Sequence, residues 1–170
     1  MDDKNIREPL TIEEVDRLCN ACSNFKEKLI VWVLLDTGMR VSEFHDLKAE
    51  NIMWFQSAIR IKSSKSKKPR VVHMTQRVKT LLEHYFALND SVDMCIRQIQ
   101  RTVKKLANRA RISRDVTPHV LRHTFATLAL QKNVSLAAVQ KALGHASIKT
   151  TEIYLNYTDE HTLSEFRDKF

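Results

Sequence analysis

Two kinds of hydrophobic periodicity divide the chain, a helical one over most of its length and a strand-like one in a short central segment. Apolar residues recur at helical spacing over residues 12–22 and fill the run from Leu29 to Leu35. Between Ile52 and Met74 the pattern changes to period two, with Ile59 and Ile61 alternating with basic residues. We therefore expect a mainly α-helical domain with a small antiparallel β-sheet.

Capping residues and a glycine set the expected helix boundaries in the first third of the chain. Thr11 is suited to cap a helix that reaches about Cys22. Gly38 is suited to end the next helix, because glycine accepts the left-handed backbone that follows a helix terminus. Arg40 then follows a sharp bend, at the start of a short helix over residues 41–47.

Three further helix starts are expected after the sheet. Thr75 is suited to cap a helix that reaches about Leu88, and a basic helix covers about residues 95–111. Thr117 followed by Pro118 is a strong start signal, because threonine caps helices and proline is tolerated at the first helical position. The second half of the chain is therefore predicted to be helical.

The C-terminal part contains a second glycine-ended helix, from Ser135 to Leu143, with Gly144 after it. A helix that opens at Ser147 and an amphipathic tail over residues 159–170 complete the prediction. The sequence shows no internal repeat, low-complexity segment or interdomain linker. We therefore expect residues 1–170 to form a single domain.

Charge suggests an anionic partner. The chain has 170 residues, of which 43% are hydrophobic, and a formal net charge of +8. Its basic residues gather in two tracts without an acidic residue, from Arg60 to Lys79 and from Arg97 to Arg114. Two such tracts suit a polyanion that runs across one surface, although either tract alone fits a solvated basic face equally well.

The sequence predicts neither a membrane span nor a metal centre. No apolar run approaches the roughly 18 residues of a span, and no signal peptide precedes the charged start, so we expect a cytoplasmic protein. Cys19 and Cys22, the closest pair of cysteines, lie in an amphipathic helix without a second pair. His119 and His123 have a zinc-binding spacing, but Val120 stands where metalloproteases have glutamate. We expect no metal and no cofactor.

Polar residues with the chemistry of phosphoryl transfer stand beside the two glycines. Arg40 comes two residues after Gly38, and His145 directly follows Gly144, with Tyr154 nine residues later. Arginine can hold an oxyanion, histidine can move a proton, and tyrosine can act as a nucleophile. Together they form a candidate site that cuts a phosphodiester without metal.

His119 and Arg122 add to this site. They stand three residues apart, so they share one helix face and can reach one ligand together. They also lie near a helix N-terminus, where free amides and the helix dipole favour an anion. The alternative is that Arg122 pairs with a carboxylate and that His119 only packs.

These residues, taken in order, resemble the tyrosine recombinase family, which includes phage integrases and Xer-like enzymes. The matching stretches are Thr37–Glu43, Lys65–Val72, His119–Thr127, and Leu143–His145 running on to Thr150–Tyr154. The resemblance covers nearly the whole chain. It implies the DNA breaking-rejoining catalytic-domain fold, double-stranded DNA as the partner, a nucleoid-associated location, and a homo-tetramer on DNA that can be monomeric in isolation.

The resemblance also implies a role for each motif residue. It makes Tyr154 the nucleophile that attacks a DNA phosphate and forms a 3′-phosphotyrosyl link. A free phenol has a pKa of about 10, so the attack needs a base, and His119 is the natural candidate. Arg40 and Arg122 would hold the non-bridging oxygens, and His145 would donate a hydrogen bond to the phosphate.

The general acid is less clearly defined. The resemblance assigns protonation of the departing 5′ oxygen to Lys65, the residue selected by counting back from Arg70. Counting forward from the preceding strand lands one residue short, on Ser64. Lys62 and Lys67 therefore remain alternatives.

Other polar residues are expected in supporting roles. Glu43, one turn after Arg40, would orient local side chains rather than react. Tyr157 competes with Tyr154 as the nucleophile, but only Tyr154 has the family spacing from His145. Basic residues of the sheet region and of the 95–111 helix would contact the DNA backbone. These residues are Lys62, Lys67, Lys68, Arg70, Arg101, Lys104 and Lys105.

Three functions are compatible with this reading. The leading one is a site-specific recombinase catalytic domain for integration, excision or resolution. The others are topoisomerase IB-like relaxation and a DNA-binding module without catalysis. The resemblance implies a separate N-terminal core-binding domain in most relatives, and we expect it to be absent here. The chain would then be an excised domain or a naturally short enzyme, and either would bind DNA weakly alone. The apolar tail resembles the segment that relatives dock into a neighbour, or it folds back onto its own core.

Overall fold

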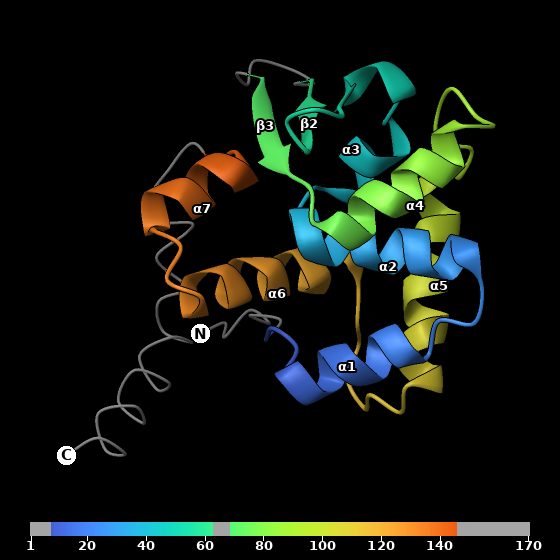
Figure 1. The fold of residues 1–170 in the computed structure, drawn as a ribbon. Coiled ribbons are helices and arrows are strands. Elements are labelled where there is room, and N and C mark those ends of the chain that lie inside the picture. The colour runs from blue at the N-terminus through green and yellow to red at the C-terminus, as the bar shows by residue number, and fades with distance from the viewer. Residues whose placement is uncertain (1–7, 63–68, 146–170) are drawn as a thin grey trace.

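Helix α2 (Phe25–Thr37) runs through the centre of a computed structural model, which describes residues 8–62 and 69–145 (Figure 1). Its side chains are buried on several sides, among them Leu29, Ile30 and Val33. A helix that is hydrophobic all round has to be covered on all sides. Neighbouring helices do this here, namely α4 (Gln76–Phe86), α5 (Ile96–Arg109) and α6 (Pro118–Gln131).

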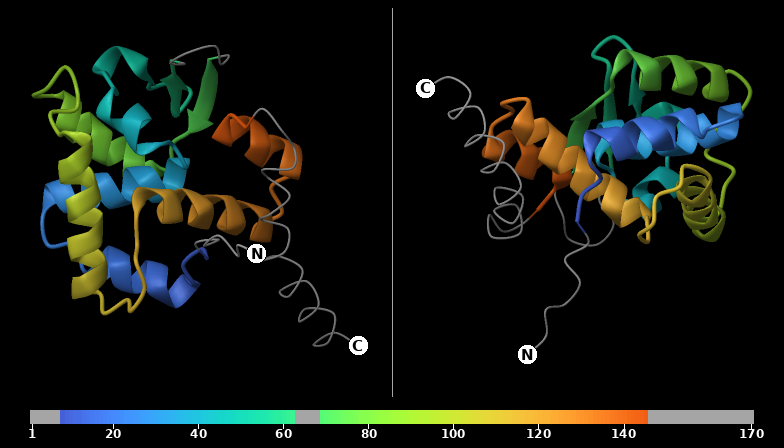
Figure 2. Two further views of the ribbon diagram at one scale, coloured as in Figure 1. Left: turned by 180° about the vertical axis from the view of Figure 1, so that it is seen from behind. Right: turned by 90° about the horizontal axis from the view of Figure 1, so that it is seen from below.

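The other elements surround this central group. They are α1 (Ile12–Asn20), α3 (Val41–His45), the short 3₁₀ helix η1 (Ala49–Asn51), the strands β1 (Ile52–Met53), β2 (Ala58–Ile61) and β3 (Arg70–His73), and α7 (Leu136–Leu143). Helix α7 packs on α6 and lies beside β3, as the view from behind in Figure 2 also shows. The mainly helical fold with a small sheet is therefore as expected.

The caps expected from the sequence are present. The hydroxyl of Thr11 accepts a hydrogen bond from the amide of Glu14, and the Glu14 carboxylate accepts one from the amide of Thr11. The hydroxyls of Thr75, Thr117 and Ser135 likewise accept hydrogen bonds from main-chain amides in the first turns of α4, α6 and α7. These side chains satisfy amides that a helix start leaves without partners. Several helices nevertheless end about two residues earlier than expected.

The sheet is antiparallel and has the order β1, β2, β3. Ile59 and Ile61 are buried and Arg60 is exposed, which confirms the period-two pattern. Ile59 lies opposite Val72 of β3. The expected lysine-rich turn between these strands falls on residues 63–68, outside the described part of the chain.

Two groups of buried side chains form the interior. The larger one surrounds α2 and includes Phe44, Met39 and Leu121. The smaller one joins α6 to α7 through Val139 and Leu143, with few neighbours. Within the described ranges, no helix has the length and apolar character needed to cross a bilayer. Helix α7 is thus attached to the main body through a small apolar contact.

Candidate active site

Arg122 lies where the two glycine-ended helices meet. Its position on α6 leaves it only 4% exposed, and its Nη1 and Nη2 donate to the carbonyls of Gly38 and Leu143, each at 2.5 Å. The last carbonyls of a helix lack helical partners and carry partial negative charge. A buried guanidinium between two such ends is therefore well compensated. The sequence left open that Arg122 pairs with a carboxylate. In both of these hydrogen bonds the acceptor is instead a main-chain carbonyl.

Gly38 forms the first corner. Its φ of 64° lies in the left-handed region, as expected for a glycine after a helix. A Cβ atom built there would lie 2.2 Å from Cδ1 of Phe125. The ring of Phe125 therefore packs directly against the glycine. This close approach is a second reason, besides the left-handed φ, why glycine occupies position 38.

Arg40 directly precedes α3, just after this corner, and Glu43 holds its main-chain amide and its side chain. The carboxylate of Glu43 accepts from the main-chain amide of Arg40 at 2.7 Å and from its Nη1 at 3.2 Å. The Arg40 side chain remains 33% exposed. Glu43 thus orients a neighbouring side chain, as expected from the sequence.

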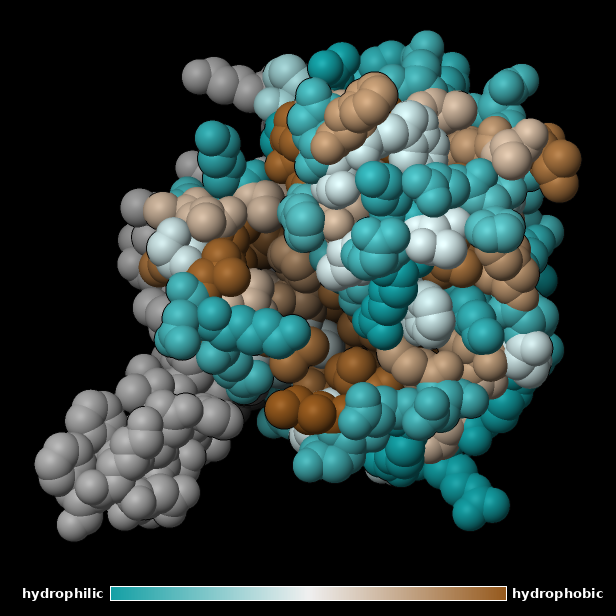
Figure 3. All heavy atoms as spheres, in the orientation of Figure 1, coloured by the Kyte–Doolittle hydropathy of each residue, from teal (hydrophilic) through white to brown (hydrophobic). Residues whose placement is uncertain are grey.

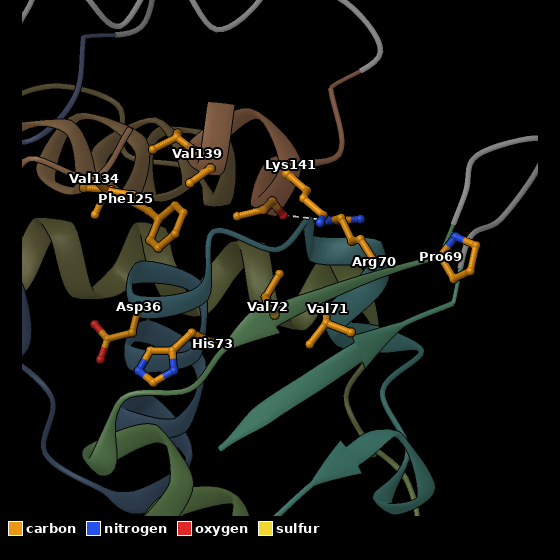
Figure 4. A pocket seen from close by; sticks show the side chains of 13 residues that line it. Asp36, Pro69, Arg70, Val71, Val72, His73, Phe125, Val134, Val139 and Lys141 are labelled. Carbon is orange, nitrogen blue, oxygen red and sulfur yellow. Dashed lines mark hydrogen bonds between the residues drawn. The ribbon is translucent and has the colours of Figure 1, made fainter. Parts of the chain in front are cut away.

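Arg70 bonds to the same carboxylate from β3. Its Nη1 and Nη2 donate to the two oxygens of Glu43 at 2.7 and 2.8 Å, and its Nε donates to the carbonyl of Ala142 in α7 at 2.7 Å. Figure 4 shows the Arg70 side chain reaching from the strand to the end of that helix. Only 10% of its side chain is exposed. The guanidinium is therefore engaged inside the protein, and the expected DNA contact of Arg70 stays a prediction.

The charge of Glu43 depends on these bonds. Burial by itself raises the pKa of Glu43, but hydrogen bonds from Arg70 and Arg40 and the charges of both arginines outweigh it. The pKa of Glu43 consequently lies below its ordinary value. The carboxylate is ionised at neutral pH and keeps both arginines in place.

His119 and His123 form a close pair on the first turns of α6. Their Nε2 atoms lie 2.8 Å apart, and their rings meet edge to face with centroids 4.4 Å apart. Burial, followed by electrostatic interactions with His119 and Arg122, lowers the pKa of His123 to about 4. His123 is therefore neutral at pH 7. From the sequence, His123 was weighed only as a metal ligand. Its spacing of four residues from His119 nevertheless places both histidines on one face of the helix.

His145 follows the second corner. Gly144 has a φ of 67° and ends α7, as expected, and the amide of His145 donates to the carbonyl of Gln140 at 3.2 Å. Because Arg122 binds the carbonyls of Gly38 and Leu143, it brings together the chain segments that carry Arg40 and His145. The expected residues outside the described part are Lys65, Lys67, Lys68, Tyr154 and Tyr157.

The other described residues of the expected DNA-binding set lie on the surface. Arg101, Lys104 and Lys105 are exposed on α5, opposite the buried Val103 face. Lys62 is exposed and pairs with Glu50 at 2.7 Å. The described part of the chain holds no group of three or more His, Cys, Asp or Glu side chains that could bind a metal. The α5 residues form an exposed cationic stripe.

A pocket of about 630 Å³ lies between β3, α6 and α7. Apolar side chains dominate its lining, including Val72, Phe125 and Val139 (Figure 4). Figure 3 shows hydrophobic side chains in the hollow between α7 and the rest of the molecule. Arg70 stands at one edge of this pocket, so the polar bonds to α7 border an apolar hollow.

Comparison with known proteins gives consistent matches. Residues 8–161 match the sequence profile described as the phage integrase family. The chain is 35% identical to tyrosine recombinase XerA of Saccharolobus solfataricus, over 90% of this chain and 53% of that protein. It is 33% identical to XerA of Pyrococcus furiosus, over 93% of this chain and 60% of that protein.

Solved structures with the same fold agree with these matches. A crystal structure of XerA recombinase has a TM-score of 0.84 and 33% identity, over 97% of this chain and 66% of that one. A post-cleavage complex of XerH recombinase with its difH substrate has a TM-score of 0.78 and 27% identity, over 94% and 52%. The chain thus spans about half to three fifths of the length of the curated relatives described above.

Proposed function

Because the chain belongs to the phage integrase family of tyrosine recombinases, we propose that it is the catalytic domain of a site-specific DNA recombinase. The reaction is a metal-independent transesterification. Tyr154 attacks a DNA phosphate, forms a 3′-phosphotyrosyl link and releases a 5′ hydroxyl. The reverse attack by a second 5′ hydroxyl restores the phosphodiester and exchanges strands.

The observation that carries this proposal is the pair of hydrogen bonds from Arg122 to the carbonyls of Gly38 and Leu143 at the two helix ends. It supports a preassembled cationic corner in which Arg40, Arg122 and His145 approach one phosphate. Arginine suits the non-bridging oxygens because its planar fork binds phosphate at two points and stays charged. Negative charge grows on these oxygens in the transition state, so a clamp formed in advance lowers the barrier.

The histidine pair supports a path for the proton of Tyr154. His119 accepts this proton at a ring nitrogen and becomes an imidazolium. His123 is neutral at pH 7, and its Nε2 can accept an N–H bond from the charged ring at their separation of 2.8 Å. Such a charge-assisted bond stabilises the imidazolium. His123 thereby acts on the tyrosine through His119.

The proton for the departing oxygen and the grip on DNA come from the basic residues. We assign the proton to Lys65, with Lys62 and Lys67 as alternatives. Arg101, Lys104 and Lys105 of the exposed stripe on α5 bind backbone phosphates of double-stranded DNA, which makes affinity fall with added salt. Two duplexes with two cleavage sites each require four copies, so a homo-tetramer on nucleoid DNA is the working assembly.

The test uses a nicked duplex from which the cleaved end diffuses away, so that a covalent intermediate accumulates. The DNA that flanks the gene supplies candidate sites. We expect wild-type protein and Tyr157→Phe to give a slow band on a denaturing gel, and Tyr154→Phe to give none. DNA binding without any covalent band from the wild type would favour a non-catalytic binding module. Exchange between two marked duplexes, rather than relaxation of a supercoiled plasmid alone, identifies recombination.

A further inference from the structure

Arg70 connects three segments that carry or flank the candidate site. It is the first residue of β3, its guanidinium binds Glu43 of α3, and its Nε binds the carbonyl of Ala142 in α7. Glu43 in turn holds Arg40. We propose that Arg70 is a positioning residue, which sets the distance between Arg40 and the His145 corner before DNA binds. This proposal rests on the recombinase function proposed above.

The geometry between Arg70 and Glu43 leaves little freedom. Two parallel bonds of 2.7 and 2.8 Å join a planar guanidinium to a planar carboxylate, an arrangement that fixes orientation as well as distance. The side chains are 10% and 14% exposed. A pair so buried is costly unless further bonds satisfy its atoms. The amide and Nη1 of Arg40 and the carbonyl of Ala142 provide such bonds.

Gly144 leaves the space that Arg70 occupies. A Cβ atom at Gly144 would lie 3.0 Å from Cδ of Arg70 and 3.2 Å from its Nε and Nη1. The glycine therefore serves two needs, a left-handed turn and close contact with this side chain. Since His145 follows directly, the position of Arg70 determines where the second corner can lie.

Because α7 has only a small apolar contact with α6, the hydrogen bond from Arg70 to Ala142 matters for the position of α7. The described packing between α6 and α7 depends on a small cluster with Val139 and Leu143, beside an apolar pocket of about 630 Å³. The bond to Ala142 ties the last turn of α7 to the strand side of that pocket (Figure 4). Loss of Arg70 is therefore expected to loosen the helix end locally while the larger core around α2 stays folded.

The variants Arg70→Met and Arg70→Lys test the role, and Arg60→Met on the exposed side of β2 is the matched control. We expect Arg70→Met to slow single-turnover cleavage at saturating DNA by about 10- to 100-fold, because small misplacements of reacting groups are costly. Its DNA dissociation constant should change by less than about threefold, because the guanidinium is engaged with Glu43 and Ala142 rather than directed at a phosphate. Arg70→Lys should recover only part of the rate, because lysine lacks the fork.

A second readout does not depend on activity. Amide hydrogen exchange of the free protein should rise in Arg70→Met over residues 140–145, while α2 remains as protected as in the wild type. Weaker DNA binding with an unchanged rate at saturation would overturn the proposal and make Arg70 a DNA contact. Unchanged exchange and an unchanged rate would overturn it as well. If wild-type protein forms no covalent adduct, the function fails, and the exchange experiment still decides whether Arg70 positions α7.

Discussion

Gly38 ends α2 and Gly144 ends α7, and the guanidinium of Arg122 binds the carbonyl of Gly38 at one corner and that of Leu143, next to Gly144, at the other. The first corner rests on the large core through Leu35 and Met39, and the ring of Phe125, which packs with the small cluster, lies directly against the glycine. The second rests on a small apolar cluster and on the bonds of Arg70. The same backbone conformation is thus fixed by packing in one place and mainly by polar contacts in the other.

The difference shows how rigidity is divided within the candidate site. A close-packed core resists displacement, so the corner before Arg40 is a fixed reference. A corner held by hydrogen bonds and one ion pair can be loosened by changes in charge. We therefore expect substitutions at the first corner to act on global stability and those at the second to act on local order and cleavage.

Arg122→Met should give the largest effect, because it acts on both corners at once. It leaves the carbonyls of Gly38 and Leu143 without their donor in a buried site, and each such group costs about 1–3 kcal/mol. We expect stability to fall by about 2–4 kcal/mol in urea unfolding, and no covalent adduct to form. Retained stability would show that the two helix ends do not depend on this residue.

Gly38→Ala should have the second largest effect on stability. Its Cβ would overlap the Phe125 ring at 2.2 Å, and its φ of 64° would strain an alanine. Strain and overpacking together suggest a loss of about 2–4 kcal/mol in thermal or urea unfolding. The double variant Gly38→Ala with Phe125→Ala, compared with Phe125→Ala alone, should show a smaller loss. An equal loss in both backgrounds would mean that the ring is not the obstacle.

Gly144→Ala should cost less stability, about 1–2 kcal/mol, because a contact of 3.0 Å requires a smaller shift of its neighbour than the contact of 2.2 Å at Gly38. Its cleavage rate should nevertheless fall, since the bond from Arg70 to Ala142 would be displaced. The measurement is single-turnover cleavage beside urea unfolding. A stability loss as large as that of Gly38→Ala would break the contrast between the corners.

Lowering the pH should have the smallest effect on the stability of the fold. This effect comes from protonation of His123, the residue next to Arg122. The pKa of His123 is lowered to about 4, whereas the unfolded chain has the ordinary value of about 6.5. Between these values the unfolded state binds the extra proton, so stability falls as pH is lowered from about 6.5 to 4. His123→Asn should show a shallower fall in urea unfolding across this window. Identical slopes would indicate that His123 titrates normally in the folded protein.

Signals that act over a few residues predicted most of the fold. Caps at Thr11 and Thr117 and the glycine stops depend on the adjacent turn, and each was found. Strand β1 and η1 were missed because elements of two or three residues show no period. Helix ends were placed too late because apolar residues continue the pattern beyond the last helical turn.

The site was predictable where a motif carries it and not where distant segments meet. Arg40, His119, Arg122 and His145 follow from the family motifs, and their catalytic roles, like those of Lys65 and Tyr154, stay predictions. The role of Arg70 depends on a carboxylate 27 residues before it and a carbonyl 72 residues after it. No local pattern encodes such separations, so charge alone suggested a DNA contact.

The most direct test of the central claim is to identify the residue that becomes linked to DNA. Wild-type protein is incubated with the nicked duplex in EDTA, digested with protease and nuclease, and analysed by mass spectrometry. We predict a nucleotide on Tyr154 through a 3′ phosphate, formed without any divalent ion. Attachment at Tyr157, or cleavage only after metal is added and without a covalent protein product, would contradict it.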